Sequence, residues 1–228
     1  MIPTTLVQVE QHSESTYTFW LKPDRLIDYT AGQFIEIYLP HDADERGTHR
    51  WFTISSSPTE KLLAITTRRA ATMSSFKKQL FAMETGQTLQ VSQAMGDFVL
   101  PMQRSIPIIF VVRGIGITPV RSMTKQLVDE SSNHRDITVI HSVKNKDDLL
   151  FKEIYQKVSS RIIERQENST DNISELITQI LEIHEQKPTA RIYVSGPEQF
   201  AEKVHGLLKS SGVKPSALVT DYFHGYKA

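Results

Sequence analysis

Residues 108–119 read IIFVVRGIGITP and contain the features that decide the fold of the second half of the chain. The run from Ile108 to Val112 is continuously apolar, which is typical of a strand in a parallel sheet that is covered on both faces. Two glycines then form a turn. Thr118 can cap the helix that follows, and Pro119 suits its first turn. A strand, a glycine turn and a helix in this order predict an α/β unit.

The same rhythm of apolar strand and amphipathic helix continues towards the C-terminus. It predicts a doubly wound α/β domain with a parallel sheet, because such strands are covered by helices on both faces. We expect strands at 108–112, 137–143 and 191–195, and helices at 119–128, 149–158 and 197–209.

The first hundred residues follow a different pattern, with short alternating or β-branched stretches between turn signals, such as QFIEIYL at 33–39. This spacing suits a small antiparallel barrel or sandwich. One helix is expected at 74–83, with Ser74 or Ser75 as its N-cap. The change of pattern near Pro101 divides the chain into domains 1–102 and 103–228.

Composition excludes several classes of function. The chain has 228 residues, 26 Lys plus Arg, 26 Asp plus Glu, and no cysteine. A neutral balance argues against nucleic-acid binding, and the absence of cysteine excludes disulfides, thiolate nucleophiles and cysteine-ligated clusters. The eight histidines lack metal-ligand spacing, so we expect no metal site. No signal peptide and no apolar run of about 20 residues is present, so we expect a cytoplasmic protein without a membrane span.

The glycine turn at 113–119 has the chemistry of an anion site. Exposed backbone amides and the helix dipole favour a pyrophosphate, although a glycine turn between strand and helix is also common as topology alone. A second junction of the same kind, VSGPE at 194–198, follows another apolar strand. In open α/β sheets, ligands collect outside the carboxyl ends of the strands, so the two junctions strengthen each other. Glu198 alone fits an ordinary favourable charge at a helix N-terminus.

In the first domain, the stretch RWFTISSSP at 50–58 places an arginine, aromatic rings and hydroxyls on one strand. A guanidinium can grip phosphate in bidentate fashion, an aromatic ring can stack on a flat heterocycle, and a hydroxyl can hydrogen-bond a ring nitrogen. From composition alone, a half-buried edge strand with a surface arginine is the better interpretation.

The order and spacing of these segments resemble the ferredoxin-NADP reductase family of flavoproteins over essentially the whole chain. That resemblance implies an antiparallel β-barrel FAD-binding domain followed by a doubly wound NAD(P)-binding domain. Arg50 then holds the flavin pyrophosphate, Phe52 lies against the isoalloxazine or ribityl arm, and Thr53 reaches the flavin N5 edge. Phe52 replaces the common tyrosine of this motif.

Further motifs extend the resemblance. ATMSSF at 71–76 matches the pyrophosphate turn at a helix start but lacks its glycine, and GDF at 96–98 resembles the turn that closes the barrel in bacterial members. The glycine turn matches the motif that receives the dinucleotide and faces the nicotinamide. Ser195 stands where the family has a cysteine beside the nicotinamide. The tail DYFHGY at 221–226 resembles members that end with an aromatic ring over the flavin, with Phe223 the first candidate and Tyr226 the second.

The resemblance implies one set of cofactor-binding residues and, within it, a smaller set at the reacting centre. Lys144 and Arg165 give a slight preference for NADPH, because a basic residue near the ribose favours its 2′-phosphate. The expected residues at the reacting centre are Thr53, Ser195 and Phe223. The expected cofactor-binding residues are Arg50, Trp51, Phe52, Thr53, Ile54, Ser55, Thr67, Arg68, Met73, Ser74, Ser75, Gly114, Gly116, Ile117, Thr118, Pro119, Ser142, Lys144, Arg165, Gly196, Pro197, Glu198, Phe223 and Tyr226.

The function implied is an FAD-dependent NAD(P)H oxidoreductase. NADPH or NADH delivers a hydride to FAD, and the flavin passes electrons to a separate acceptor such as ferredoxin, flavodoxin or another one-electron acceptor. One alternative is an FAD-bearing sensor or electron-transfer subunit that works only within a larger complex. A second alternative is an α/β binding module without flavin.

Overall fold

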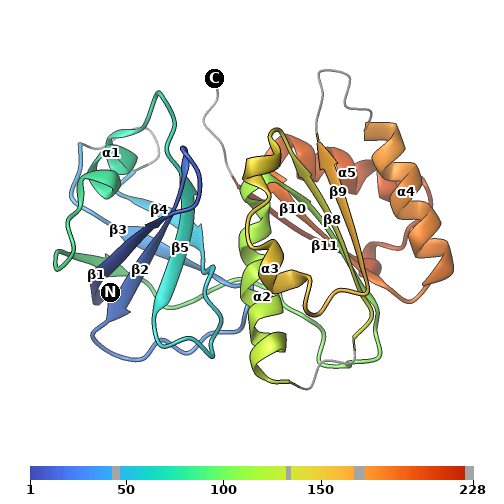
Figure 1. Cartoon of the computed structure of the whole chain (residues 1–228), viewed down its shortest axis with the longest axis horizontal. Coiled ribbons are helices and arrows are strands. Elements are labelled where there is room, and N and C mark those ends of the chain that lie inside the picture. The colour runs from blue at the N-terminus through green and yellow to red at the C-terminus, as the bar shows by residue number, and fades with distance from the viewer. Residues whose placement is uncertain (43–46, 132–134, 167–172, 224–228) are drawn as a thin grey trace.

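The computed structural model describes residues 1–42, 47–131, 135–166 and 173–223 and contains two lobes side by side (Figure 1). The first lobe is a six-stranded antiparallel sheet in the order β4-β3-β6-β1-β2-β5. A bridge between Ile54 and Ile65 joins the two edge strands, so the sheet curls into a barrel. Its elements are β1 (Ile2–Gln11), β2 (Thr16–Pro23), β3 (Phe34–Tyr38), β4 (His49–Thr53), β5 (Leu63–Arg68), α1 (Ser75–Ala82) and β6 (Thr88–Val91).

The second lobe is a five-stranded parallel sheet in the order β11-β10-β7-β8-β9. Helix α2 lies on the face towards the barrel, and α4 and α5 lie on the other face (Figure 1). The doubly wound fold is therefore confirmed. Its elements are β7 (Ile108–Arg113), α2 (Ile117–Asp129), β8 (Ile137–Val143), α3 (Lys152–Tyr155), β9 (Arg161–Gln166), α4 (Ile173–Gln186), β10 (Arg191–Pro197), α5 (Glu198–Ser210) and β11 (Leu218–Phe223).

Local sequence explains α1 well and α3 poorly. Ser74 caps α1, as expected, because its Oγ accepts a hydrogen bond from the Lys77 amide at 3.2 Å. The helix expected at 149–158 is shorter, because Phe151 has a φ of 60° and a residue in the left-handed region cannot lie inside a helix. No strand was expected over β1 in the first lobe, or over β9 and β11 in the second.

The segment between β6 and β7 packs under the junction of the two lobes. Phe98 is buried, and its ring meets the Tyr193 ring of β10 edge-on with 5.1 Å between ring centroids. The Tyr193 hydroxyl donates to the Val99 carbonyl at 2.7 Å. The expected packing of Phe98 under the boundary is therefore confirmed. In the described part of the chain, no helix is long and apolar enough to span a bilayer.

Candidate active site at the seam between the two lobes

The glycine turn lies at the carboxyl end of the central strand β7. Gly114 has a φ of 53°, and a β-carbon there would lie 3.2 Å from a guanidinium nitrogen of Arg68 in the barrel. A β-carbon on Gly116 would lie 2.3 Å from the Ser195 carbonyl oxygen. Both glycines therefore allow close approach of other chain segments, and the first amides of α2, which have no acceptor within the helix, directly follow the turn.

The cap of α2 differs from the expected one. Gly116 is the N-cap and provides no side-chain hydrogen bond, whereas the Thr118 hydroxyl donates to the Ile115 carbonyl at 3.1 Å. The expected capping role of Thr118 is therefore wrong. Pro119 lies in the first turn, as expected, where the missing amide hydrogen costs nothing.

The second junction lies beside the first. Strands β10 and β7 are parallel neighbours, with Ser195 opposite Val112. The strand order reverses between them, because β8 and β9 lie beyond β7 on one side and β11 lies beyond β10 on the other. Such a switch point is the usual ligand site of open α/β sheets. Pro197 is the N-cap of α5 and Glu198 the first helical residue, one position later than expected.

Ser195 is fully buried. Among the described residues, no donor or acceptor lies within hydrogen-bond distance of its Oγ. A buried hydroxyl without a partner loses the hydrogen bonds it would make in water, so it calls for a ligand group or another explanation. Ser195 therefore offers a polar atom to a ligand at the switch point.

The barrel contributes an arginine and an aromatic wall. Arg50 of β4 is buried, and its Nη1 donates to the carbonyls of Gly47 and His49 at 3.1 and 2.7 Å. Its guanidinium carbon lies 5.3 Å from the centre of the Phe76 ring of α1, and that ring stacks with Phe52 at 5.9 Å. Arginine, aromatic rings and the N-terminus of α1 thus lie together.

The other residues expected on the barrel side divide between the interior and the surface. Thr53, Ile54, Ser55 and Thr67 are buried, whereas Trp51 is 56% exposed and its Nε1 donates to Glu36 Oε1 at 3.1 Å. The remaining expected residues, Met73, Ser74 and Ser75, are half-buried around the start of α1.

Arg68 connects the barrel to the glycine turn. It ends β5, lies against Gly114, and places Nη2 3.5 Å from Asp148 Oδ2 of the second lobe. Its Nε and Nη2 are buried, and neither makes a hydrogen bond to any described residue. Arg68 was expected among the cofactor contacts, and the structure places it at the seam beside the glycine turn.

His141 was missed by sequence reasoning. It lies fully buried on β8, with Nε2 3.3 Å from the Gly114 carbonyl oxygen. Burial lowers its pKa to about 4, so the ring is neutral near pH 7 and Nε2 donates to that carbonyl. No local motif marks this residue, because only the β7–β8 register brings it to the glycine turn.

The residues expected near the ribose lie at the ends of β8 and β9. Ser142 is buried opposite Arg113, and Lys144 is exposed just after β8. Arg165 is engaged with α4, since its Nη1 lies 3.5 Å from Gln179 Oε1 and its Nη2 4.0 Å from Glu175 Oε2.

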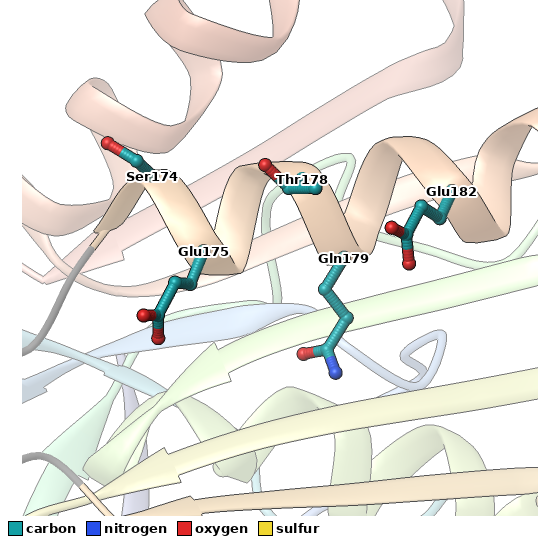
Figure 2. Close-up of a pocket in the computed structure, with 5 residues that line it drawn as sticks. All are labelled: Ser174, Glu175, Thr178, Gln179 and Glu182. Atoms are coloured by element: carbon teal, nitrogen blue, oxygen red, sulfur yellow. The ribbon is translucent and has the colours of Figure 1, made fainter.

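A shallow pocket on α4 contains none of the expected site residues. Figure 2 shows Glu175, Gln179 and Glu182 projecting from one side of the helix and Ser174 and Thr178 from the other. Two carboxylates disfavour a phosphate-bearing ligand, so we place the site at the seam instead.

The C-terminal strand ends beside the second junction. Phe223 pairs with Pro197 in the β10–β11 register, so β11 ends next to the second junction. Nothing is described of the Phe223 side chain, and Tyr226 lies outside the described residues.

The residues present fit both cofactors that the sequence resemblance implies. The buried Arg50 beside the N-terminus of α1 suits the pyrophosphate of FAD, and Phe52 with Phe76 suits its flat parts. The first amides of α2 after the glycine turn, together with the Arg68 guanidinium and the Ser195 hydroxyl, suit a second dinucleotide. Among the described residues, no group of histidines and carboxylates could hold a metal ion.

Comparisons with known proteins agree with this geometry. The oxidoreductase NAD-binding domain family matches residues 110–206. The chain is similar to the flavohemoprotein of Bacillus subtilis, with 26% identity over 97% of this chain and 59% of that protein. It therefore spans about three fifths of the length of that relative.

Two solved structures share the fold. Ferredoxin-NADP+ reductase from Plasmodium falciparum is 20% identical with a TM-score of 0.78, covering 97% of this chain and 95% of that chain. The FAD/NAD-binding domain of nitric oxide dioxygenase from Vibrio cholerae is 16% identical with a TM-score of 0.72, covering 97% and 98%. The expected two-domain fold is confirmed. Residues 110–206 thus match an oxidoreductase NAD-binding domain, and the chain as a whole has the fold of ferredoxin-NADP+ reductase and is similar in sequence to flavohemoproteins.

Proposed function

We propose that this chain takes a hydride from NAD(P)H and passes the electrons through FAD to a separate one-electron acceptor, such as ferredoxin or flavodoxin. The observation that carries the proposal is the seam itself. Arg68 of the barrel lies against Gly114 at the switch point of the parallel sheet, so ligands of the two lobes would meet there. We propose a cytoplasmic location, which cell fractionation tests.

The residues of the chain divide the work between holding and orienting the two cofactors. Bound FAD supplies an acceptor that takes two electrons together and releases them singly. Arg50 and the N-terminal amides of α1 would hold its pyrophosphate. Thr53 is buried at the end of β4, and its hydroxyl would donate a hydrogen bond to the flavin edge.

The second lobe would hold and orient NAD(P)H. The amides after Gly114 would receive the dinucleotide pyrophosphate, and Arg68 would add a positive charge from across the seam. The Ser195 hydroxyl would hydrogen-bond the nicotinamide and so gain the partner it lacks.

The proposed dinucleotide is NADPH in slight preference to NADH. Exposed Lys144 would contact the 2′-phosphate, whereas Arg165 would first have to leave Gln179 and Glu175. We expect Lys144→Ala and Arg165→Ala to raise the KM for NADPH more than that for NADH, with the larger effect at Lys144. Equal effects on both dinucleotides would contradict a 2′-phosphate contact.

The direct test is stopped-flow reduction of the FAD-loaded chain by NADH and NADPH, followed by ferricyanide and candidate acceptors. Fast flavin bleaching and steady-state ferricyanide reduction are expected. A purified protein that gains no flavin spectrum with FAD would refute the proposal. Arg50→Gln should raise the dissociation constant for FAD at least tenfold, because a charged hydrogen bond is worth about 1.5–3 kcal/mol.

A second candidate is a subunit that works only within a larger complex. The flavohemoprotein relatives extend well beyond the part that this chain matches, which favours a further component. In that case the isolated chain would bind FAD but would oxidise almost no NAD(P)H in the presence of ferricyanide.

A further inference from the structure

Arg121 joins the two lobes at the centre of the seam. It lies on α2, one turn after the helix starts, and is only 6% exposed. Its Nη1 donates to the Ser55 carbonyl at 2.7 Å and to Glu60 Oε2 at 2.7 Å, and its Nη2 donates to Glu60 Oε1 at 3.0 Å. A two-point guanidinium–carboxylate pair fixes orientation as well as distance.

Aromatic rings from both lobes enclose this guanidinium. Its central carbon lies 5.4 Å from the ring centre of Trp20 on β2 and 5.4 Å from that of Phe151 before α3. Phe151 has a φ of 60°, an unfavourable value for a bulky residue, so its position is held by surrounding contacts. One such contact is the edge-on ring of His12 from the barrel, with 5.2 Å between ring centroids.

A chain of hydroxyls stiffens the barrel side of the joint. Ser55 Oγ lies 2.9 Å from Thr66 Oγ1, which lies 2.8 Å from Thr18 Oγ1, which in turn lies 2.7 Å from His12 Nε2. Thr66 and Thr18 lie on β5 and β2, whereas Ser55 follows β4 and His12 follows β1. Ser55 is therefore tied to three further segments of the barrel as well as to Arg121.

Helix α2 makes two more hydrogen bonds to the same loop of the barrel. The Ser122 hydroxyl donates to the Ser56 carbonyl at 2.5 Å, and the Thr59 hydroxyl donates to Asp129 Oδ2 at 2.5 Å. The loop from Ser55 to Glu60 thus contacts α2 between Arg121 and Asp129, and both of its ends hydrogen-bond Arg121.

We propose that Arg121 and Glu60 are positioning residues that set the distance between the nicotinamide and the flavin. Arg121 lies one turn from the glycine turn, and its acceptor Ser55 lies two residues from Thr53. The pair therefore connects the helix that follows the glycine turn to the barrel segment that follows Thr53. This inference rests on the proposed function.

The kinetic test separates hydride transfer from ligand binding. Arg121→Met and Glu60→Gln are loaded with FAD, and flavin bleaching by NADPH is followed by stopped flow over a range of concentrations. We expect the limiting rate to fall about 100-fold in Arg121→Met, as a misplacement of about 1 Å can cost. The dissociation constants for FAD and NADPH should change less than threefold. Arg121→Lys keeps the charge but cannot make the two-point pair, so its limiting rate should lie between those of the unsubstituted chain and Arg121→Met.

A distance measurement provides a readout that does not depend on activity. The chain has no cysteine, so spin labels at Gln79→Cys on α1 and Lys203→Cys on α5 meet no background thiol. We expect the label-to-label distance distribution to broaden in Arg121→Met, with or without FAD. The control is Lys187→Met, which removes an ion pair to Asp136 inside the second lobe and should leave the distribution unchanged.

The outcomes are distinct. A broadened distribution with a slowed limiting rate supports the proposal. An unchanged distribution, or a broadened one with an unchanged limiting rate, overturns it, and so does a rate loss explained by FAD release. If Arg121→Met does not fold, Glu60→Gln and Arg121→Lys decide by the same criteria. If the unsubstituted chain binds FAD but neither dinucleotide reduces it, the proposed function fails, whatever the distance measurements show.

Discussion

Replacing Gly116 with alanine should force the two strand-to-helix junctions apart. The new β-carbon would lie 2.3 Å from the Ser195 carbonyl oxygen, 2.6 Å from the Ser195 carbonyl carbon and 2.8 Å from Gly196 Cα. All three atoms belong to the backbone, so no side chain can rotate away. The clash must be relieved by moving β10 or the start of α2.

The size of that movement follows from the contact distance. Ordinary contacts of a β-carbon begin at 3.4 Å, so the carbonyl oxygen must retreat by 1.1 Å, the difference between 3.4 and 2.3 Å. Overpacking of this kind costs about 1–3 kcal/mol of unfolding free energy. A shift of about 1 Å at the reacting centre also costs about 100-fold in rate.

Urea unfolding gives the stability change, and titration with NADP+ gives the dinucleotide affinity. Gly206→Ala is the matched control, because Gly206 lies in α5 with no atom within 4 Å of the β-carbon position. It should gain about 0.5–1 kcal/mol from helix propensity. The reasoning is refuted if Gly116→Ala has the same urea midpoint and the same dissociation constant for NADP+ as the unsubstituted chain.

Two further predictions concern buried polar groups near the glycine turn. Ser195→Cys should raise the unfolding free energy of the ligand-free chain by about 1 kcal/mol, because it replaces a hydroxyl without a partner by a small apolar group; unchanged urea unfolding would contradict this. The pKa of His141 is about 4 in the folded chain and 6.5 in the unfolded chain. Between these pH values the unfolded chain binds more protons, so the free energy of unfolding falls as the pH drops, by up to roughly 3 kcal/mol. His141→Gln should flatten urea-derived stability between pH 6.5 and 4, and an unaltered slope would show that other groups dominate.

Strong local patterns predicted the architecture because the inner strands of the sheet are apolar throughout. Strands β7, β8 and β10 are central, buried on both faces, and were all expected. The two strands of this sheet that were missed, β9 and β11, are its edges. RIIERQ in β9 has only exposed and half-buried positions, so it lacks the continuous apolar run that marks the inner strands. Edge position, which only the assembled sheet defines, explains both omissions.

The site residues that were missed act through partners far along the chain. Arg121 meets Glu60 across 61 positions, and His141 meets Gly114 across 27. Sequence motifs report what a short segment can do, whereas these contacts depend on the packing of α2 against the barrel and on strand register. A local rule also failed at Thr118, whose hydroxyl bonds a carbonyl because Gly116 already occupies the cap position.

The glycines of the turn therefore serve two purposes that the sequence alone does not separate. Close approach to a phosphate and close approach of one backbone to another both require the absence of a β-carbon. Gly114 makes room for Arg68 and Gly116 for Ser195, so each is needed for packing even without a ligand. The two purposes coincide because the packed neighbours, Arg68 and Ser195, are themselves the groups proposed to contact the dinucleotide. A substitution at either glycine should consequently change stability and dinucleotide affinity together, whereas one at Lys144 should change affinity alone.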